Sequence, residues 1–298
     1  SAEVVARVEA RAERDVVRQL SRELQRRHRL ISEQGMLRLN GLRLSLYRFV
    51  HTLFQQYLYG NLSEAERVYL HHDIGATLEA LFSGKTEPVA AQLAHHFEQA
   101  DVPDKAAHYR LQAGNRALRI SAHREAEDHF RRGLALASRL DQGSERMDLE
   151  LALRSSLGAS FVVTQGYAAP GVEQAFTRVR ELSLALGQED GLVPALYGLS
   201  TCHFVRAQLQ QAIAEGTQLL NLAKESGQEG YELACRLVLG AAATHMGNLP
   251  EAQTQLEQVA AQYDPDQHGQ LVHLLGHDPL IGALSYLAFV RWHQGYPE

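Results

Sequence analysis

Apolar and polar residues follow one another with the period of an α-helix along most of this chain. From residue 64 onward, apolar residues recur every three or four positions, which predicts a succession of amphipathic helices. Their expected ranges are 64–82, 87–99, 103–118, 121–138, 145–164, 170–186, 190–204, 207–225, 229–246 and 249–262. No strand pattern recurs in this part of the chain, so we expect it to be entirely helical.

A pair made of one apolar and one small residue returns along these helices at a nearly constant interval. The pairs are Ala113-Gly114, Leu157-Gly158, Tyr197-Gly198, Leu239-Gly240 and Leu287-Ala288, at spacings of 44, 40, 42 and 48 residues. Such a period is typical of stacked helical hairpins, in which each repeat buries its apolar face against its neighbours. We therefore predict an all-α, right-handed, tetratricopeptide-like solenoid over 63–298, with about five repeats, the last one truncated.

Two of these repeats follow the tetratricopeptide spacing closely. Gly114 is followed at the expected distance by Phe130, and Gly240 by Leu256. A glycine allows two helices to cross at short distance, and a large side chain on the second helix fills the space beside it. We expect Phe130 and Leu256 to occupy that position.

The first 62 residues have a different pattern. Residues 3–28 carry a helical apolar stripe, whereas 42–49 alternate apolar and polar residues with the period of a strand. Asn40-Gly41 stands before the alternating segment, and Asn-Gly is a strong signal for a type I′ hairpin turn. Helices followed by a β-hairpin predict a small winged-helix domain at 1–62.

Charge and cysteine content refine this division. The whole chain has a formal net charge of -6, but 1–50 carry a net charge of +5 and the remainder -11, which indicates two modules of different character. Cys202 and Cys235 both lie in apolar helical patterns, and two cysteines make no disulfide framework. No apolar run approaches the roughly 20 residues that span a bilayer. We expect a soluble, cytoplasmic protein without a membrane partner.

Several segments resemble one bacterial family. The segment 47–59, with 64–71 after it, resembles the junction between winged helix and solenoid in multidomain signal-transduction ATPases of the STAND (AAA-like) type. Further segments look like the tetratricopeptide region of bacterial predicted ATPases, including maltose-activator-like proteins. They are 94–97, 106–109, 166–170, 263–268, 276–279 and 284–288. The resemblance covers nearly the whole chain.

The resemblance implies a regulatory role. In this family a nucleotide-binding domain precedes the winged helix and holds ATP or ADP with Mg²⁺, and the output domain is a class III nucleotide cyclase, a kinase or a transcriptional activator. A histidine that opens the helix after the wing reaches the β-phosphate of ADP, and His51 occupies that place here. This chain contains no G-x-x-x-x-G-K-[ST] loop. We therefore expect no enzyme activity and no cofactor in it, and we expect it to be part of a longer polypeptide.

The residues around His51 have a simpler interpretation as well. A histidine at this position can cap the helix or fill the junction with the wing. The spacing of Phe49, Leu53, Tyr57 and Leu58 places them on one helical face, which predicts a core position.

Basic residues gather in two places. One group is a candidate binding surface for an acidic peptide or protein, and the alternative is a solvated face balanced by Glu125, Glu127 and Asp128. Its members are Arg110, Arg116, Arg119, Arg124 and Arg131. The other is a stripe in the predicted winged helix that interleaves with acidic residues, so the sequence does not favour nucleic acid as partner. It consists of Arg18, Arg22, Arg26, Arg27 and Arg29.

Histidines invite a metal interpretation that their spacing does not favour. His71-His72 and His95-His96 are adjacent pairs, and neighbouring helical residues point about 100° apart. The two histidines of a pair therefore cannot bind one metal ion together. His273 and His277 are four residues apart, but Gly276 and Pro279 interrupt a helix there. We expect no metal. Near the end of the chain, Tyr286, Phe289 and Trp292 recur at helical intervals and are predicted to be core.

These observations lead to one principal hypothesis and one alternative. We expect a non-catalytic sensor and interaction region, which binds a protein, a peptide or a small effector on the solenoid. The winged helix would pass this event to a nucleotide-binding domain outside the chain, and homo-oligomerisation stays open. The alternative is a DNA-binding transcriptional regulator that uses the winged helix as reader.

Overall fold

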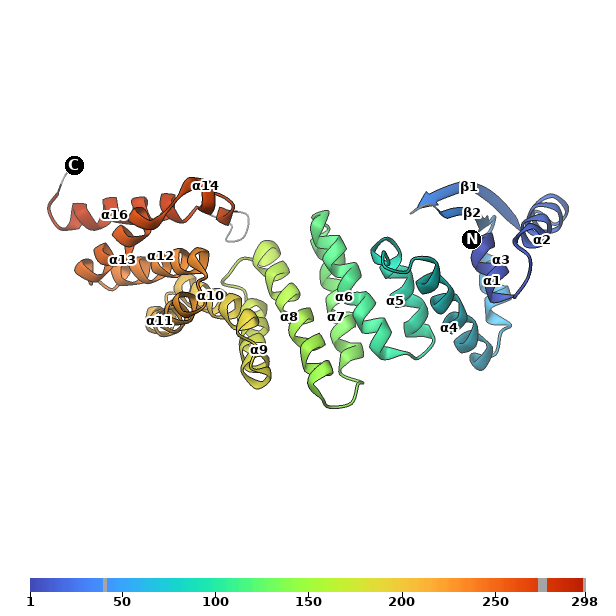
Figure 1. Cartoon of the computed structure of the whole chain (residues 1–298), viewed down its shortest axis with the longest axis horizontal. Helices are drawn as coiled ribbons and strands as arrows, with labels where there is room; N and C mark the ends of the chain where they lie inside the picture. Colours follow the sequence, from blue (N-terminus) through green and yellow to red (C-terminus); the bar gives the residue numbers. More distant parts are fainter. Residues whose placement is uncertain (40–41, 273–277, 297–298) are drawn as a thin grey trace. The chain divides into compact units, whose positions relative to one another are not determined.

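The computed structural model describes residues 1–39, 42–272 and 278–296, and its helices and strands are shown in Figure 1. The chain forms two compact units, Ser1–Asp141 and Gln142–Glu298. It is mostly helical, with helices stacked in each unit and one small antiparallel sheet near the N-terminus. The predicted boundary between residues 62 and 63 lies inside the first unit, so the division into 1–62 and 63–298 stays a prediction.

The first unit begins with three helical segments, a hairpin and a short helix. They are α1 (Ala2–Val8), α2 (Glu13–Gln19), the π-helix η1 (Leu20–Arg27), β1 (Ile31–Leu39), β2 (Leu42–Phe49) and α3 (Thr52–Gly60). The strands pair antiparallel from Ile31 opposite Phe49, as the alternation predicts, with a register shift between Glu33 and Gly35. Gly35 accommodates this irregularity with a φ of +103°. The predicted turn at Asn40-Gly41 lies outside the described residues.

Buried polar contacts fix this hairpin to the first helices. The Glu3 carboxylate accepts hydrogen bonds from the backbone N–H of Ser45 at 2.8 and 2.9 Å, and Glu3 is buried. Ala2, Ala6 and Val16 form a small core. The hydroxyl groups of Ser21 and Tyr47 lie 2.9 Å apart and join η1 to β2. The first unit therefore holds its hairpin by its own residues.

Helices form the rest of the first unit. They are α4 (Glu64–Leu81), the 3₁₀ turn η2 (Glu87–Val89), α5 (Ala90–Gln99), α6 (Pro103–Arg119) and α7 (His123–Ala137). A capping box made by Ser63 and Glu66 begins α4. Gly114 on α6 confirms the predicted close crossing, because a Cβ atom there would lie 2.4 Å from the Phe130 ring on α7.

The second unit contains eight described helices, most of which pack on their neighbours in sequence. They are α8 (Ser144–Gln165), α9 (Pro170–Leu186), α10 (Glu189–Val205), α11 (Leu209–Glu225), α12 (Glu229–His245), α13 (Leu249–Gln262), α14 (Pro265–His268) and α16 (Pro279–His293). The predicted ranges agree with the bounds of α4 to α13 to within a few residues. Helices α3, α14 and α16 have no counterpart among the predicted ranges. No helix among the described residues is long and apolar enough to cross a membrane.

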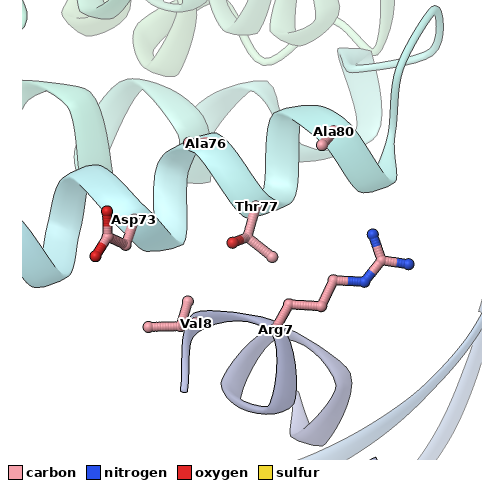
Figure 2. Close-up of a pocket in the computed structure, with 6 residues that line it drawn as sticks. All are labelled: Arg7, Val8, Asp73, Ala76, Thr77 and Ala80. Atoms are coloured by element: carbon pink, nitrogen blue, oxygen red, sulfur yellow. The ribbon is translucent and has the colours of Figure 1, made fainter. Parts of the chain in front are cut away.

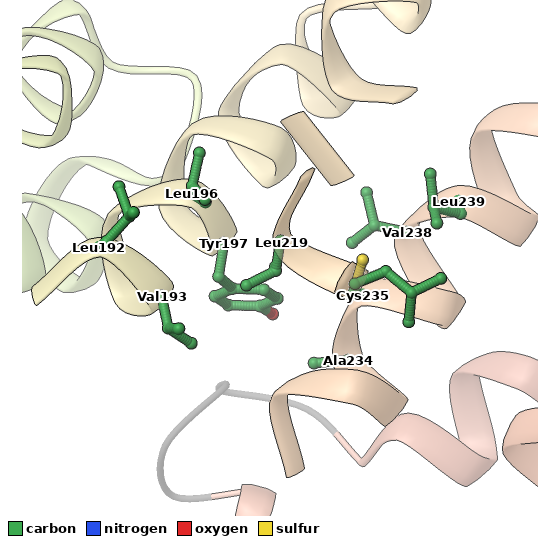
Figure 3. Packing of buried hydrophobic residues seen from close by; sticks show 10 residues of the cluster. Leu192, Val193, Leu196, Tyr197, Leu219, Ala234, Cys235, Val238 and Leu239 are labelled. Atoms are coloured by element: carbon green, nitrogen blue, oxygen red, sulfur yellow. The ribbon is translucent and has the colours of Figure 1, made fainter. Parts of the chain in front are cut away.

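Close crossings recur in the second unit. A Cβ at Gly240 would lie 2.6 Å from Leu256, as predicted. The Phe176 ring of α9 takes part in two crossings. A Cβ atom added to Gly158 on α8 would lie 3.1 Å from this ring, and one added to Gly198 on α10 would lie 2.5 Å from it. Figure 3 shows the core between α10, α11 and α12, in which Tyr197 and Leu219 lie near Cys235.

The end of the second unit contradicts one prediction. Trp292 is 66% exposed and Phe289 is 47% exposed, so the aromatic residues of α16 are not core, although Tyr286 is partly buried. Helical spacing places residues on a common face, but burial requires another element to cover that face. No element in the described part of the chain covers these two rings.

Candidate functional site

The structure places His51 between the hairpin and α3. It is separated from β2 by Val50 and is the N-cap residue of α3, with φ -126° and ψ 132°. Its side chain is exposed and makes no capping hydrogen bond, and its ring lies 5.9 Å from the ring of Phe54. Backbone N–H groups of a first helical turn attract anions. The His51 side chain thus does not cap the helix by a hydrogen bond, and its contact with a phosphate stays a prediction.

The helix that His51 begins is exposed on all sides. No residue of α3 is buried, and the exposed fractions reach 75% at Leu53 and 70% at Tyr57. We define the α3 face as its five exposed large apolar residues, namely Leu53, Phe54, Tyr57, Leu58 and Tyr59. The prediction of a core position for Leu53, Tyr57 and Leu58 is therefore wrong. Among the described elements, β2 is the main neighbour of α3, and it leaves these side chains uncovered.

The basic stripe of the N-terminal helices is also at the surface. No residue of η1 is buried, and Arg22, Arg26 and Arg29 are exposed. Arg27 pairs with Glu23 at 3.0 Å, and exposed pairs of this kind contribute little stability. The α3 face therefore belongs to a module with an excess of exposed positive charge.

The second group of arginines does not form one surface. Arg110 is buried, donates to Glu98 at 2.5 Å, and has its guanidinium 3.2 Å from Nδ1 of His129. The other four are exposed. Arg116 donates to the Pro88 carbonyl at 2.7 Å, Arg119 pairs with Glu87 at 2.5 Å and Arg131 pairs with Glu127 at 3.1 Å. An acidic peptide would have to compete with these partners, so the geometry favours a structural role for most of this group.

Three histidines that the sequence analysis treated as separate pairs meet across α4 and α5. Nδ1 of His71 lies 2.9 Å from Nδ1 of His96, and its Nε2 lies 2.9 Å from the hydroxyl of Tyr59 on α3. The ring of His95 is 5.6 Å from that of His71. The sequence-based interpretation rested on histidines that are adjacent or four residues apart. The signal that it missed is the position of His71 and His96 on consecutive helices that pack together.

The surroundings of His71 and His96 favour their neutral forms. Burial, helped by the neighbouring His71 and His95, lowers the pKa of His96 to about 4. Burial also lowers the pKa of His71, again helped by His95. Among the described residues no group of three or more metal-binding side chains has the arrangement of a metal site. His273 and His277 lie outside the described residues.

Two hollows accompany these features in the first unit. One is a shallow hollow of about 350 Å³ between α1 and α4, shown in Figure 2. It brings together Arg7, Asp73 and Thr77, and because its polar groups carry both signs it matches no single class of charged ligand. The other is a cavity of about 170 Å³ beside His96, lined mainly by apolar side chains.

Comparisons with known proteins leave the family open. No protein-family model matches the chain, and no curated protein matches it. Among solved structures, one described as the crystal structure of BtubC (BKLC) from P. vanneervenii has a TM-score of 0.47 and 14% sequence identity, covering 79% of this chain and 92% of that chain. A likeness of this degree identifies no function.

Proposed function

We propose that this chain is a non-catalytic interaction and sensor region, whose N-terminal module docks through the α3 face onto a nucleotide-binding domain. The module at 1–62 acts as a winged helix, and the helices of 63–298 act as a tetratricopeptide-like array that binds a protein or peptide. The observation that carries the proposal is α3 itself. A nine-residue helix without one buried residue bears five large apolar side chains, next to an exposed histidine at its N-terminus.

The size of the α3 face indicates what kind of partner it has. A large apolar side chain contributes about 1.5–3 kcal/mol when it is fully buried, and the exposed parts of these five residues amount to nearly three whole side chains, so covering them favours docking by roughly 4–8 kcal/mol. Association of two separate proteins costs an estimated 4–15 kcal/mol, which offsets most or all of this gain. A domain on the same polypeptide meets a much smaller cost, because a linker holds it at about millimolar effective concentration. These energies favour a domain on the same polypeptide as the partner of the α3 face.

His51 supplies the link to the nucleotide. Its exposed imidazole stands beside the first N–H groups of α3, and this combination of donors suits a phosphate. ATP or ADP with Mg²⁺ would be held by the docked domain, and His51 would contact the β-phosphate of ADP. A ligand that favours one docked arrangement then changes the nucleotide-bound state.

A matched pair of variants tests docking in the full-length product of the gene. The double variant Leu53→Glu and Tyr57→Glu should weaken docking of the α3 face on the nucleotide-binding domain. We expect it to speed ADP release by about tenfold, which corresponds to about 1.4 kcal/mol. Ile120→Glu is the control, because Ile120 is 69% exposed outside the α3 face. Equal ADP release from the variant, the control and the unmodified protein, or a full-length product without a nucleotide-binding domain, contradicts the proposal.

His51→Ala separates phosphate contact from docking. In the full-length product we expect faster ADP release and higher basal output, while amide hydrogen exchange of α3 stays as slow as in the unmodified protein. Unchanged ADP release removes His51 from the mechanism and leaves docking in place.

DNA binding is the second candidate, and the exposed arginines of η1 favour it. A helix that presents Arg22 and Arg26 to solvent can contact backbone phosphates. Titration with random duplex DNA at low salt distinguishes the two functions. We expect no dissociation constant below about 10⁻⁶ M, the tighter end of non-specific affinity. Tight, sequence-selective binding would reverse the order of the two candidates.

A further inference from the structure

The cavity beside His96 is lined mainly by apolar side chains from separate elements of the first unit. α1 contributes Val4, the hairpin contributes Leu44, and α4 with its C-cap residue contributes Ile74, Leu78 and Phe82. The cavity holds about 170 Å³. An engineered protein cavity of about 150 Å³ with a comparable apolar lining binds benzene. The space therefore suits a molecule of about the size of one substituted six-membered ring.

The polar groups of the cavity are few. No Lys, Arg, Asp or Glu side chain is among its described lining residues, whose polar side chains are those of Ser1, Gln92 and His96. The α-amino group of Ser1 also lies here, and burial lowers its pKa, which favours its neutral form. A charged ligand would lose its hydration there without an opposite charge in return. A neutral molecule with a single polar group fits this lining, since it can meet the imidazole and bury its apolar part.

His96 connects the cavity to α3 through hydrogen bonds. Its Nδ1 faces Nδ1 of His71, and Nε2 of His71 faces the hydroxyl of Tyr59, both at 2.9 Å. Nε2 is thus the ring nitrogen of His96 that remains for a molecule in the cavity. His71 is 6% exposed, so solvent has little access to the middle of the chain of contacts.

Neutral imidazoles allow two arrangements of protons along these contacts, because each ring carries one N–H. In the first, Tyr59 donates to Nε2 of His71, Nδ1–H of His71 donates to His96, and Nε2 of His96 carries a proton. In the second, Nε2 of His96 accepts, its Nδ1–H donates to His71, and Nε2–H of His71 donates to Tyr59. The hydroxyl proton of Tyr59 is then free to donate elsewhere at the α3 face.

We propose that this cavity binds a small neutral molecule with an apolar ring and one hydroxyl group, and that the hydroxyl donates to Nε2 of His96 and selects the second arrangement. Binding thereby changes Tyr59 from a donor within the first unit to a donor at the α3 face. The second half of this inference rests on the proposed docking function, whereas the binding site itself does not. It places a sensor site within the first 96 residues, where the N-terminal helix and the hairpin meet the first helices of the proposed array.

Phenol is the probe for the site. Toluene is the control, because it has about the same size and shape but carries no hydrogen-bonding group. Titrated into the isolated 298-residue chain and followed by NMR, phenol should bind with a dissociation constant of about 1 mM, which is modest for a ligand of this size. Toluene should bind about fivefold more weakly, the equivalent of one net hydrogen bond. Nuclear Overhauser contacts from phenol to the methyl groups of Ile74 and Leu78 in the unmodified protein should locate it.

Variants identify the role of each part. Ile74→Trp fills the cavity and should abolish binding of both probes, whereas Ile120→Trp, at an exposed position, should bind both normally. His96→Phe should still bind toluene but lose the fivefold preference for phenol. Tyr59→Phe should bind phenol within twofold of the unmodified chain, because the residue lies outside the cavity.

The proton arrangement has its own measurement. Imidazole ¹⁵N shifts should show His96 protonated at Nδ1 and His71 at Nε2 when phenol is bound. No saturable binding up to about 20 mM phenol, or contacts to methyl groups elsewhere in place of Ile74 and Leu78, overturns the site. Binding with unchanged ¹⁵N shifts overturns the proton relay. Neither measurement uses a nucleotide-binding domain, so a failure here is distinguishable from a failure of docking by α3.

Discussion

Helices α3 and α12 are both rich in apolar residues and have opposite surroundings. In α12 every residue from Leu233 to Thr244 is buried, because α10, α11, α13 and α16 all pack against it. In α3 no residue is buried, although Leu53, Tyr57 and Leu58 would suit a core equally well. The difference lies in the neighbours and not in the residues. An apolar helix needs a partner, and the part of the chain described here provides one for α12 and none that covers α3.

The largest expected effect is the removal of a side chain that packs on α12. Leu256 is fully buried on α13 and fills the space beside Gly240. Leu256→Ala should lower the free energy of unfolding by about 3 kcal/mol, through lost burial and the cavity left behind. Urea unfolding followed by circular dichroism measures it. A loss below about 1 kcal/mol would show that α12 is less tightly covered than the structure indicates.

Adding a side chain at Gly240, the other side of this contact, should lower the free energy of unfolding by about 1–2 kcal/mol. Gly240→Ala adds a Cβ that would lie 2.6 Å from Leu256, and this overlap outweighs the gain of roughly 1 kcal/mol in helix propensity. In the double variant with Leu256→Ala the overlap disappears, so the two losses should not add. Additive losses would contradict a direct contact.

Low pH should weaken the hydrogen-bonded contacts that join Tyr59 of α3 to His71 on α4 and His96 on α5. The folded-state pKa of His96 is lowered to about 4, so between about pH 6.5 and 4 the unfolded chain binds more protons there, and stability falls as pH falls. Because the group is partly exposed and thus screened, we expect a loss of about 1 kcal/mol from pH 7 to pH 5. His96→Gln should show a smaller loss in the same urea titrations. An equal loss in both proteins would exclude His96 as its source.

The smallest effect belongs to the α3 face. Leu53→Ala and Tyr57→Ala should each change the unfolding free energy of the isolated chain by less than about 0.5 kcal/mol, since both side chains are largely in solvent. Comparing the unfolding free energies of these two variants with that of Leu256→Ala measures how much an apolar helix gains when other helices cover it. A loss of more than about 1.5 kcal/mol at either position would indicate that α3 is packed.

Much of this fold could be predicted from the sequence, because its contacts are local. The ranges predicted for α9 and α13 agree with their bounds, and the crossings of Gly114 with Phe130 and of Gly240 with Leu256 are confirmed. Helical period and small residues act between consecutive helices, so a one-dimensional pattern contains the information.

Features that depend on how elements meet could not be predicted in the same way. The spacing of Leu53 and Tyr57 defines a face but not what covers it. His71 and His96 meet because α4 packs on α5, at 25 residues of separation. Arg110 carries a full charge, yet it is buried because Glu98 and His129 surround it. For His71 and for Arg110 the deciding partner belongs to another helix, and for Leu53 and Tyr57 no described element covers the face.

The ring of Phe176 bears on how such an array changes in length. It fills the space beside Gly158 on one side and beside Gly198 on the other, so it serves two successive hairpins. Deleting the hairpin of α8 and α9 would remove the ring that fills the space beside Gly198 and would open a void in the hairpin that remains. An array of this kind can gain or lose hairpins during evolution only at junctions where each glycine keeps a large side chain opposite it.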